Sequence, residues 1–181
     1  MAYEKAALNT FTQIKLFRPS DGTRATVTSD RVNSFSPAFH PDGEFLYFLS
    51  DRNLRSLVGS PWGPRAPEPF FDKTNEIFVV ALEDGLRFPF SPSHELTPEE
   101  EEDKDGGSAD RGNRSGEDLG APASVQVGLD GLMDRVKQVP VPAGNYRGLE
   151  VNEDALFFSD REAGQSGGGS LKAVAISRED P

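Results

Sequence analysis

The amino-acid sequence predicts an all-β protein made of antiparallel, four-stranded units. Residues 34–52 read as a hairpin, because aromatic and aliphatic runs at 35–39 and 45–49 flank the Pro-Asp-Gly turn at 41–43. The near-continuous apolar run 76–82 is typical of a central strand that is covered on both faces. No stretch of the chain shows the periodicity of an amphipathic helix.

Two shorter strands precede this hairpin. Residues 13–17 alternate polar and apolar side chains, and 24–28 are rich in β-forming residues, with a turn at 19–22 between them. Together with the hairpin they predict an antiparallel meander of roughly forty residues, which is the size of one propeller blade.

The same order of strands and turns recurs later in the chain. Residues 76–84 followed by 124–158 repeat the order seen at 13–49, and both copies end in Ser-Asp-Arg. Residues 171–176 would open a third copy. The sequence therefore predicts a partial β-propeller of about two to two and a half four-stranded antiparallel blades. Because so few blades cannot close a ring, the chain is expected to belong to a larger propeller or to assemble into one.

Composition divides the chain into three parts. Residues 1–96 are predicted to form propeller blades with a Pro-rich loop at 60–71, and 121–181 to form the following blade and the start of the next. Between them, 97–120 is an acidic, Gly-rich insertion with nine acidic and three basic residues, expected to be disordered.

The Pro-rich loop carries three aromatic residues, Trp62, Phe70 and Phe71. Such a loop can serve as a polyproline ligand for an aromatic groove. The alternative, that its aromatic side chains cover an edge of the core, is favoured for a long loop of this kind.

Charge and composition exclude several classes of partner. The formal net charge of −11 argues against a nucleic-acid-binding or anionic-membrane surface. The absence of cysteine excludes disulfides and thiolate metal sites and fits a cytoplasmic location, with the periplasm left open. No apolar run is long enough to cross a membrane, and the N-terminal residues resemble neither a signal peptide nor a natural domain start.

The sequence predicts no catalytic, cofactor-binding or metal-binding residue, and no cofactor. His40 and His94 are the two imidazoles, and neither lies in a recognisable nucleophile motif. Residues 99–103 could hold a hard cation, but they lack the ligand spacing of a calcium loop. The repeated Ser-Asp-Arg at 50–52 and 159–161 is interpreted as structural: the Asp accepts turn amides and the Arg pairs with it across neighbouring blades.

Several of these segments resemble one protein family. Residues 36–52 look like the propeller repeat shared by tricorn-type proteases and TolB-type proteins. Residues 77–82 followed by 88–92, and 127–135 followed by 140–148, resemble successive segments of the second propeller of tricorn-type proteases.

The resemblance implies a non-catalytic propeller that guides or filters peptides toward a serine-protease core in later domains. Peptides, the remaining propeller, a PDZ-like module and the catalytic domains are the implied partners, in a homo-oligomeric assembly. The Tyr146-Arg147 neighbourhood supports this interpretation, and the negative charge is expected to favour basic peptides. The alternative is a stand-alone TolB-like binding module that oligomerises into a ring. An enzyme complete in this chain is the least favoured interpretation, and the parent protein would be a serine peptidase.

Overall fold

The computed structural model describes residues 1–57, 70–91, 125–164 and 168–177. In these residues the regular structure consists of β-strands and one 3₁₀ helix, Leu132–Arg135, so the predicted all-β class is confirmed. The strands are β1 (Ala2–Ala6), β2 (Thr12–Phe17), β3 (Arg24–Thr26), β4 (Ser34–Phe39), β5 (Phe45–Ser50), β6 (Ser56–Leu57), β7 (Phe70–Phe71), β8 (Glu76–Ala81), β9 (Val136–Gln138), β10 (Tyr146–Val151), β11 (Ala155–Asp160) and β12 (Ser170–Ala175).

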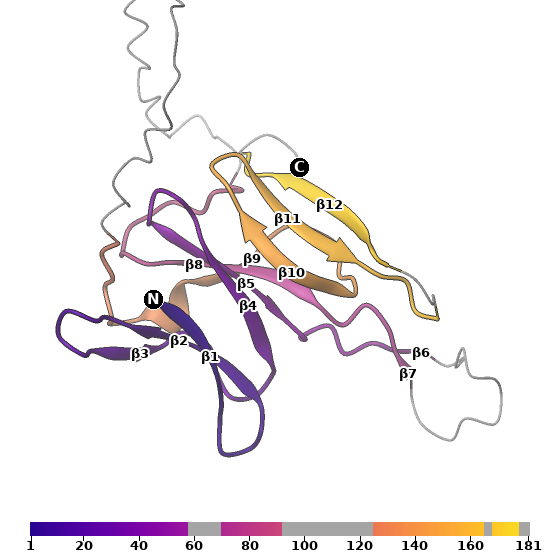
Figure 1. Cartoon of the computed structure of the whole chain (residues 1–181), viewed down its shortest axis with the longest axis horizontal. Coiled ribbons are helices and arrows are strands. Elements are labelled where there is room, and N and C mark those ends of the chain that lie inside the picture. The colour runs from indigo at the N-terminus through magenta and orange to yellow at the C-terminus, as the bar shows by residue number, and fades with distance from the viewer. Residues whose placement is uncertain (58–69, 92–124, 165–167, 178–181) are drawn as a thin grey trace, which may run out of the picture.

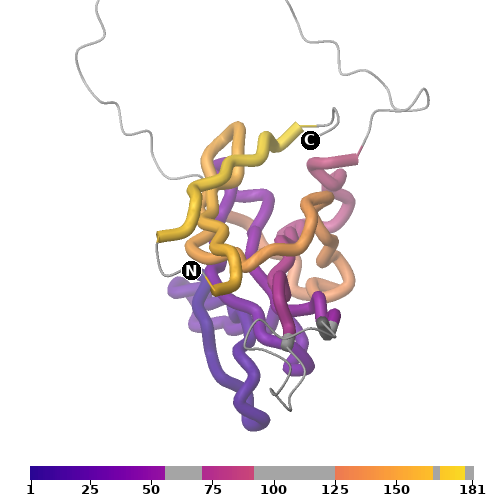
Figure 2. Tube along the Cα trace, turned by 90° about the vertical axis from the view of Figure 1, so that its right-hand side faces the viewer, coloured from indigo at the N-terminus to yellow at the C-terminus, as the bar shows by residue number. Residues whose placement is uncertain are grey.

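Three antiparallel sheets are stacked on one another (Figure 1). The first has the order β1-β2-β3, the second β4-β5-β8-β9 and the third β10-β11-β12, while β6 and β7 form a separate two-stranded ribbon. The second sheet lies between the other two, because one apolar cluster joins it to the first sheet and another joins it to the third. Figure 2 shows the first sheet and β12 at opposite ends of the molecule.

The two central strands of the second sheet, β5 and β8, are buried on both faces. In β5, Leu46 and Phe48 pack toward the first sheet, whereas Tyr47 and Leu49 pack toward the third. Successive side chains of a strand point to opposite faces, so a strand between two sheets must be apolar at every position. The predicted burial of the 76–82 run on both faces is confirmed, with residues 77 to 80 of β8 each no more than 6% exposed.

The hairpin at 34–52 is confirmed, but the meander predicted for 13–49 is wrong. Strands β2 and β3 pair with β1, whereas β4 and β5 pair with each other and with β8. Residues 27–33 carry the chain from the first sheet to the second instead of closing a turn within one sheet. The three stacked sheets are therefore one four-stranded sheet flanked by two three-stranded sheets. The predicted boundaries between blades are displaced by two strands from the observed boundaries between sheets.

Three further expectations are corrected. Residues 171–176 do not open a new unit, because β12 pairs along its whole length with β11. Residues 125–129 form no strand: Gly128 donates one backbone bond to Leu82, and no ladder follows. In the Pro-rich loop Phe70–Phe71 is a short strand rather than loop, and the rest of that loop, with Trp62, lies outside the described residues, as does 97–120.

The buried tyrosines Tyr47 and Tyr146 give a matched test of the core. Tyr47 is fully buried and its hydroxyl has no hydrogen-bond partner among the described residues, whereas the Tyr146 hydroxyl donates to the carbonyl of Pro142. We expect Tyr47→Phe to raise the free energy of unfolding at pH 7 by about 1 kcal/mol, and Tyr146→Phe to lower it by about 1 kcal/mol. Denaturant titrations measure both.

The same pair predicts a difference at alkaline pH. Burial, and then the charge of Asp42, raises the pKa of Tyr47 above its usual value. A tyrosine whose pKa is raised by folding loses its contribution as the pH rises above the unfolded value of about 10. Tyr47→Phe should therefore retain more of its stability than the wild type above that pH. A destabilised Tyr47→Phe protein at pH 7 would contradict the assignment of the hydroxyl as unpartnered.

Candidate functional site

The edge strands β4 and β10 are where neighbouring sheets come closest. Strand β4 contacts β1 and β2 of the first sheet and β10 of the third, and β10 also contacts β5. Both are outermost strands of their sheets, and we call the surface formed by Ser34–Phe39 and Tyr146–Val151 the edge surface. If the three sheets are arranged around a common axis, as the blades of a propeller are, then β4 and β10 are the strands of their sheets that lie nearest to that axis.

Each of these strands carries a bulge at the same place. The register with the neighbouring strand shifts between Phe35 and Ala38 in β4 and between Arg147 and Glu150 in β10. A residue with positive φ lies inside each bulge, Ser36 at 52° and Gly148 at 62°. Bulges of this kind bend an edge strand and change the direction of its side chains. In β10 the side chains of Arg147 and Glu150, one at each side of the bulge, are exposed.

The bulge in β4 is also tied to the first sheet. The backbone amide of Ser36 donates a 2.8 Å hydrogen bond to Oε1 of Glu4 in β1. A carboxylate that accepts from a backbone amide makes one of the stronger hydrogen bonds. This bond satisfies an amide that the bulge has removed from the ladder, and it holds β1 and β4 together.

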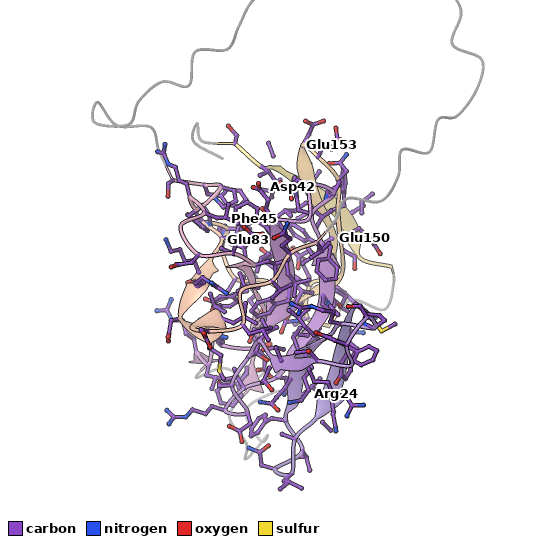
Figure 3. All side chains as sticks on the ribbon, turned by 90° about the vertical axis from the view of Figure 1, so that its left-hand side faces the viewer. Arg24, Asp42, Phe45, Glu83, Glu150 and Glu153 are labelled. Atoms are coloured by element: carbon purple, nitrogen blue, oxygen red, sulfur yellow. The ribbon has the colours of Figure 1, made fainter. Side chains whose placement is uncertain are left out.

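His40 lies between the β4–β5 turn and the β10–β11 turn, at one end of the edge surface. Its Nδ1 is 2.8 Å from Oδ2 of Asp42 in the β4–β5 turn, and its Nε2 is 3.3 Å from the carbonyl oxygen of Glu153 in the β10–β11 turn. Glu44 and Asp154 are exposed on the same two turns. Figure 3 shows Asp42 and Glu153 toward the same end of the molecule. This arrangement joins two sheets and places four carboxylates around the turns.

Two asparagines join neighbouring sheets at the opposite end of the edge strands. The backbone N–H and the side-chain amide nitrogen of Asn33 each donate a 2.7 Å hydrogen bond to the carboxylate of Asp51, and the side-chain oxygen accepts from the backbone of Thr12 in the first sheet. Asn145 repeats the pattern. Its backbone amide donates to Asp160, and its side-chain oxygen accepts from the backbone of Lys73, just before β8. We call these two sets of bonds the asparagine clasps.

The two Ser-Asp-Arg segments do not occupy equivalent positions in the ladders. Ser50 pairs with Ser34 at the start of β4, whereas Asp160 pairs with Tyr146 at the start of β10. Asp160 therefore corresponds to Ser50 and not to Asp51. Each Asp nevertheless accepts the backbone amide of a clasp asparagine, although Asn33 and Asn145 directly precede an edge strand and do not lie in a turn.

The predicted pairing of Arg52 with an Asp across neighbouring blades is wrong. Its guanidinium carbon lies 4.1 Å above the ring of Phe78, in the same sheet, and its Nε donates to the hydroxyl of Ser50. Burial lowers the pKa of Arg52, and the charges of Glu76 and Asp51 oppose that effect. A guanidinium stacked on a ring and bonded to a hydroxyl supports the sheet, and it offers no group for catalysis.

A pocket of about 200 Å³ lies between the end of β8 and β9. Its lining includes the apolar side chains of Phe45, Val79 and Phe88 and the charged side chains of Glu83 and Lys137. The ammonium group of Lys137 lies 5.5 Å from the centre of the Phe88 ring. Small-molecule sites are usually larger, at about 300–1,000 Å³. The pocket is therefore of a size that suits a single side chain.

The described residues include only some of those considered from the sequence. Tyr146 is buried, and Arg147 is exposed on the edge surface. His94 and residues 99–103 lie outside the described part of the chain. Within that part, no three His, Cys, Asp or Glu side chains are grouped in a way that could hold a metal ion. No helix there has the length and apolar character needed to cross a membrane.

Sequence reasoning missed the asparagine clasps and the paired bulges. Asn33 and Asn145 each directly precede an edge strand, which is the signal that could have found the clasps. The bulge in β10 had a signal in Gly148, a lone glycine within a strand, whereas Ser36 in β4 is not a residue that usually adopts a positive φ.

Comparisons with known proteins agree on one relationship. The chain is 25% identical over 157 residues to tricorn protease homolog 1 of Streptomyces coelicolor, a match that covers 81% of this chain and 12% of that protein. Its fold matches the crystal structure of the tricorn protease with a TM-score of 0.65 and 18% identity, over 97% of this chain and 16% of that chain. No family model matches the chain. The resemblance to tricorn-type proteases predicted from the sequence is confirmed, and the chain spans only a small part of either relative.

Asp160 makes the second clasp sensitive to acid. Burial raises the pKa of this carboxyl, but the hydrogen bonds from Lys172 and from the Asn145 amide outweigh burial, so the pKa lies below its usual value. A carboxylate with a lowered pKa stabilises the fold above its unfolded pKa of about 4, and that contribution is lost as the pH falls through the folded value. We expect Asp160→Asn to lower the melting temperature at pH 7 and to flatten its dependence on pH below about 4.

Thermal unfolding followed by circular dichroism at a series of pH values tests this expectation. Asp84→Asn is the control, because Asp84 lies in an exposed turn and its carboxylate makes no hydrogen bond or ion pair among the described residues. A melting temperature for Asp160→Asn that follows the wild type at every pH would contradict the role assigned to the carboxylate.

Proposed function

Because this chain matches a propeller portion of tricorn-type proteases, we propose that it forms part of a channel wall that guides or filters peptides. The serine-protease core that would receive these peptides, a PDZ-like module and the remaining blades belong to other parts of a longer, homo-oligomeric protein in this proposal. The acidic insertion at 97–120 is part of the same proposal, with blade residues at 1–96 before it and the following blade within 121–181 after it. No residue of this chain is assigned a catalytic role.

The observation that carries the proposal is the edge surface. Two bulged strands from neighbouring sheets lie side by side there, and the turns at one end of both strands carry carboxylates. In a propeller the sheets surround a central channel, so the strands at which sheets converge are the ones that can face it. Arg147 and Glu150 on β10 would then contact a passing peptide.

Charge determines which peptides this surface would favour. Asp42, Glu44, Glu153 and Asp154 surround the two turns, and His40 is the one basic side chain in the described contacts between those turns. A cluster of charges of one sign raises the local concentration of ligands that carry the opposite charge, and salt weakens the effect. Peptides rich in Lys and Arg are therefore the favoured substrates for passage.

Binding of fluorescent peptides to the complete chain tests the proposal. We expect a basic peptide to bind more tightly than neutral or acidic peptides of equal length, with affinity falling by about tenfold between low and physiological salt. Glu153→Gln should weaken binding of the basic peptide by about twofold to fivefold, because one carboxylate at the turns is neutralised.

Asp30→Asn is the matched control, since it removes one exposed charge in the loop between β3 and β4. This variant should leave the affinity unchanged. Equal affinity for basic, neutral and acidic peptides, or binding that does not respond to salt, would rule out an electrostatic filter at these turns.

A further inference from the structure

The outward face of the first sheet carries cationic and aromatic side chains together with the polar Gln13 and Thr26. Ile14 and Leu16 of β2 point into the core shared with the second sheet, so Lys15 between them points away from it. Tyr3 pairs with Lys15, and Arg24 pairs with Phe17, so these side chains share the outward face. Lys5 lies on the same face, opposite Gln13.

The three cations form a diagonal across the sheet, which we call the cationic stripe. Lys5 is on β1, Lys15 on β2 and Arg24 on β3, and each is displaced along the ladder by two residues from the one before. Given the usual spacing of strands and of residues along them, neighbouring cations of the stripe are about 8 Å apart. An extended peptide presents side chains on one face every 6–7 Å or so, which is a comparable spacing.

Among the described residues of the first sheet, no acidic side chain lies beside the stripe to neutralise it. The outward positions of β1, β2 and β3 include no Asp or Glu, in a chain whose formal net charge is −11. The Lys15 ammonium donates to the hydroxyl of Thr26, and the Arg24 guanidinium lies 5.7 Å from the centre of the Phe17 ring. Among the described ion pairs, none involves a residue of the stripe. Figure 3 shows Arg24 well separated from Asp42, Glu83 and Glu153.

Comparison with the second sheet shows that this face is unsuited to an apolar cover. In β8, Phe78 lies between the core residues Ile77 and Val79, as Lys15 lies between Ile14 and Leu16 in β2. Phe78 is 6% exposed and packs toward the first sheet. If another apolar sheet covered the first sheet in the same way, it would bury the Lys15 ammonium without a charged partner. Burial of an unpaired ammonium is strongly unfavourable, so whatever covers this face must bring carboxylates.

We propose that the cationic stripe is a docking surface for an extended, acidic segment of a partner polypeptide. Carboxylates on alternate residues of that segment pair with Lys5, Lys15 and Arg24, and its remaining side chains pack on Tyr3 and Phe17. The net charge of −11 repels a nucleic-acid backbone at longer range, whereas a short acidic segment need only match the local charge. This surface is distinct from the acidic turns of the edge surface and prefers ligands of the opposite charge.

The test measures binding of a synthetic peptide of alternating Glu and Thr to the complete chain. A peptide of alternating Lys and Thr is the ligand control. We expect the acidic peptide to bind, Lys15→Glu to weaken binding by about tenfold or more, and raised salt to weaken it further. Arg55→Glu makes the same charge change at an exposed position next to the β6–β7 ribbon, away from the first sheet (Figure 1), and should change the affinity by less than about twofold.

A second variant, Lys15→Phe, keeps the test informative if Lys15→Glu fails to fold. It places in β2 the residue that β8 has, so it should fold, as circular dichroism would show, and still lose binding of the acidic peptide. Unchanged binding in either folded variant, or no binding of the acidic peptide by the wild type, overturns the proposal. Tighter, Lys15-dependent binding of single-stranded RNA than of the acidic peptide also overturns it. None of these outcomes depends on whether basic peptides bind at the acidic turns.

Discussion

Burial of β5 and β8 on both faces is the constraint on which the rest of this structure depends. Apolar side chains alternate between two sides of the second sheet, so water must be excluded from both. Removing either neighbouring sheet would expose residues such as Phe48 or Leu49, and each such side chain is worth about 2 kcal/mol or more of transfer free energy. The first and third sheets are therefore required by the second. Their positions in turn bring β1, β4 and β10 together at one edge.

The asparagine clasps and the bulges fix how the stacked sheets meet. Apolar packing is not directional, so it specifies that two sheets touch but not their offset along the strands. Asn33 and Asn145 each bind an amide of the preceding sheet and an acidic residue of their own sheet, which sets that offset. Because these bonds lie at one end of the edge strands, the turns at the other end are left free to carry charge. The carboxylate of Glu153 can thus serve a ligand without being needed for the stacking, whereas Asp42 also holds His40, which joins the two sheets.

The sequence was sufficient for features determined by neighbouring residues and insufficient for those determined by distant pairing. The hairpin at 34–52 and the apolar strand β8 were predicted because turn chemistry and periodicity are local signals. Strand β1 was missed, since Ala, Glu and Lys are depleted in strands and nothing local shows that it would pair with β2. The assignment of β2 and β3 to a different sheet from β4 rests on contacts that periodicity does not report.

The candidate site was less predictable than the fold for the same reason. The repeated Ser-Asp-Arg gave a misleading alignment, because the motif begins at the sixth residue of β5 but at the fifth residue of β11. This difference moves the second motif by one position in the ladder relative to the first. The Asn-to-Asp bonds persist because either carboxylate can reach the asparagine amide from its own position. The role of the motif could be inferred from residue type, whereas its register required the pairing of the strands.

Net charge is a poor guide to the partners of this chain, because its charges are segregated. The formal value of −11 suggests that acidic ligands are repelled everywhere. At physiological salt, however, exposed charges act over about 8 Å, which is less than the distance across a small domain. A ligand near Lys15 and Arg24 therefore experiences those cations and not the carboxylates at the acidic turns, which lie well away from Arg24 (Figure 3). A chain of this kind can attract a basic peptide to one surface and an acidic segment to another, and the local field at each surface decides which.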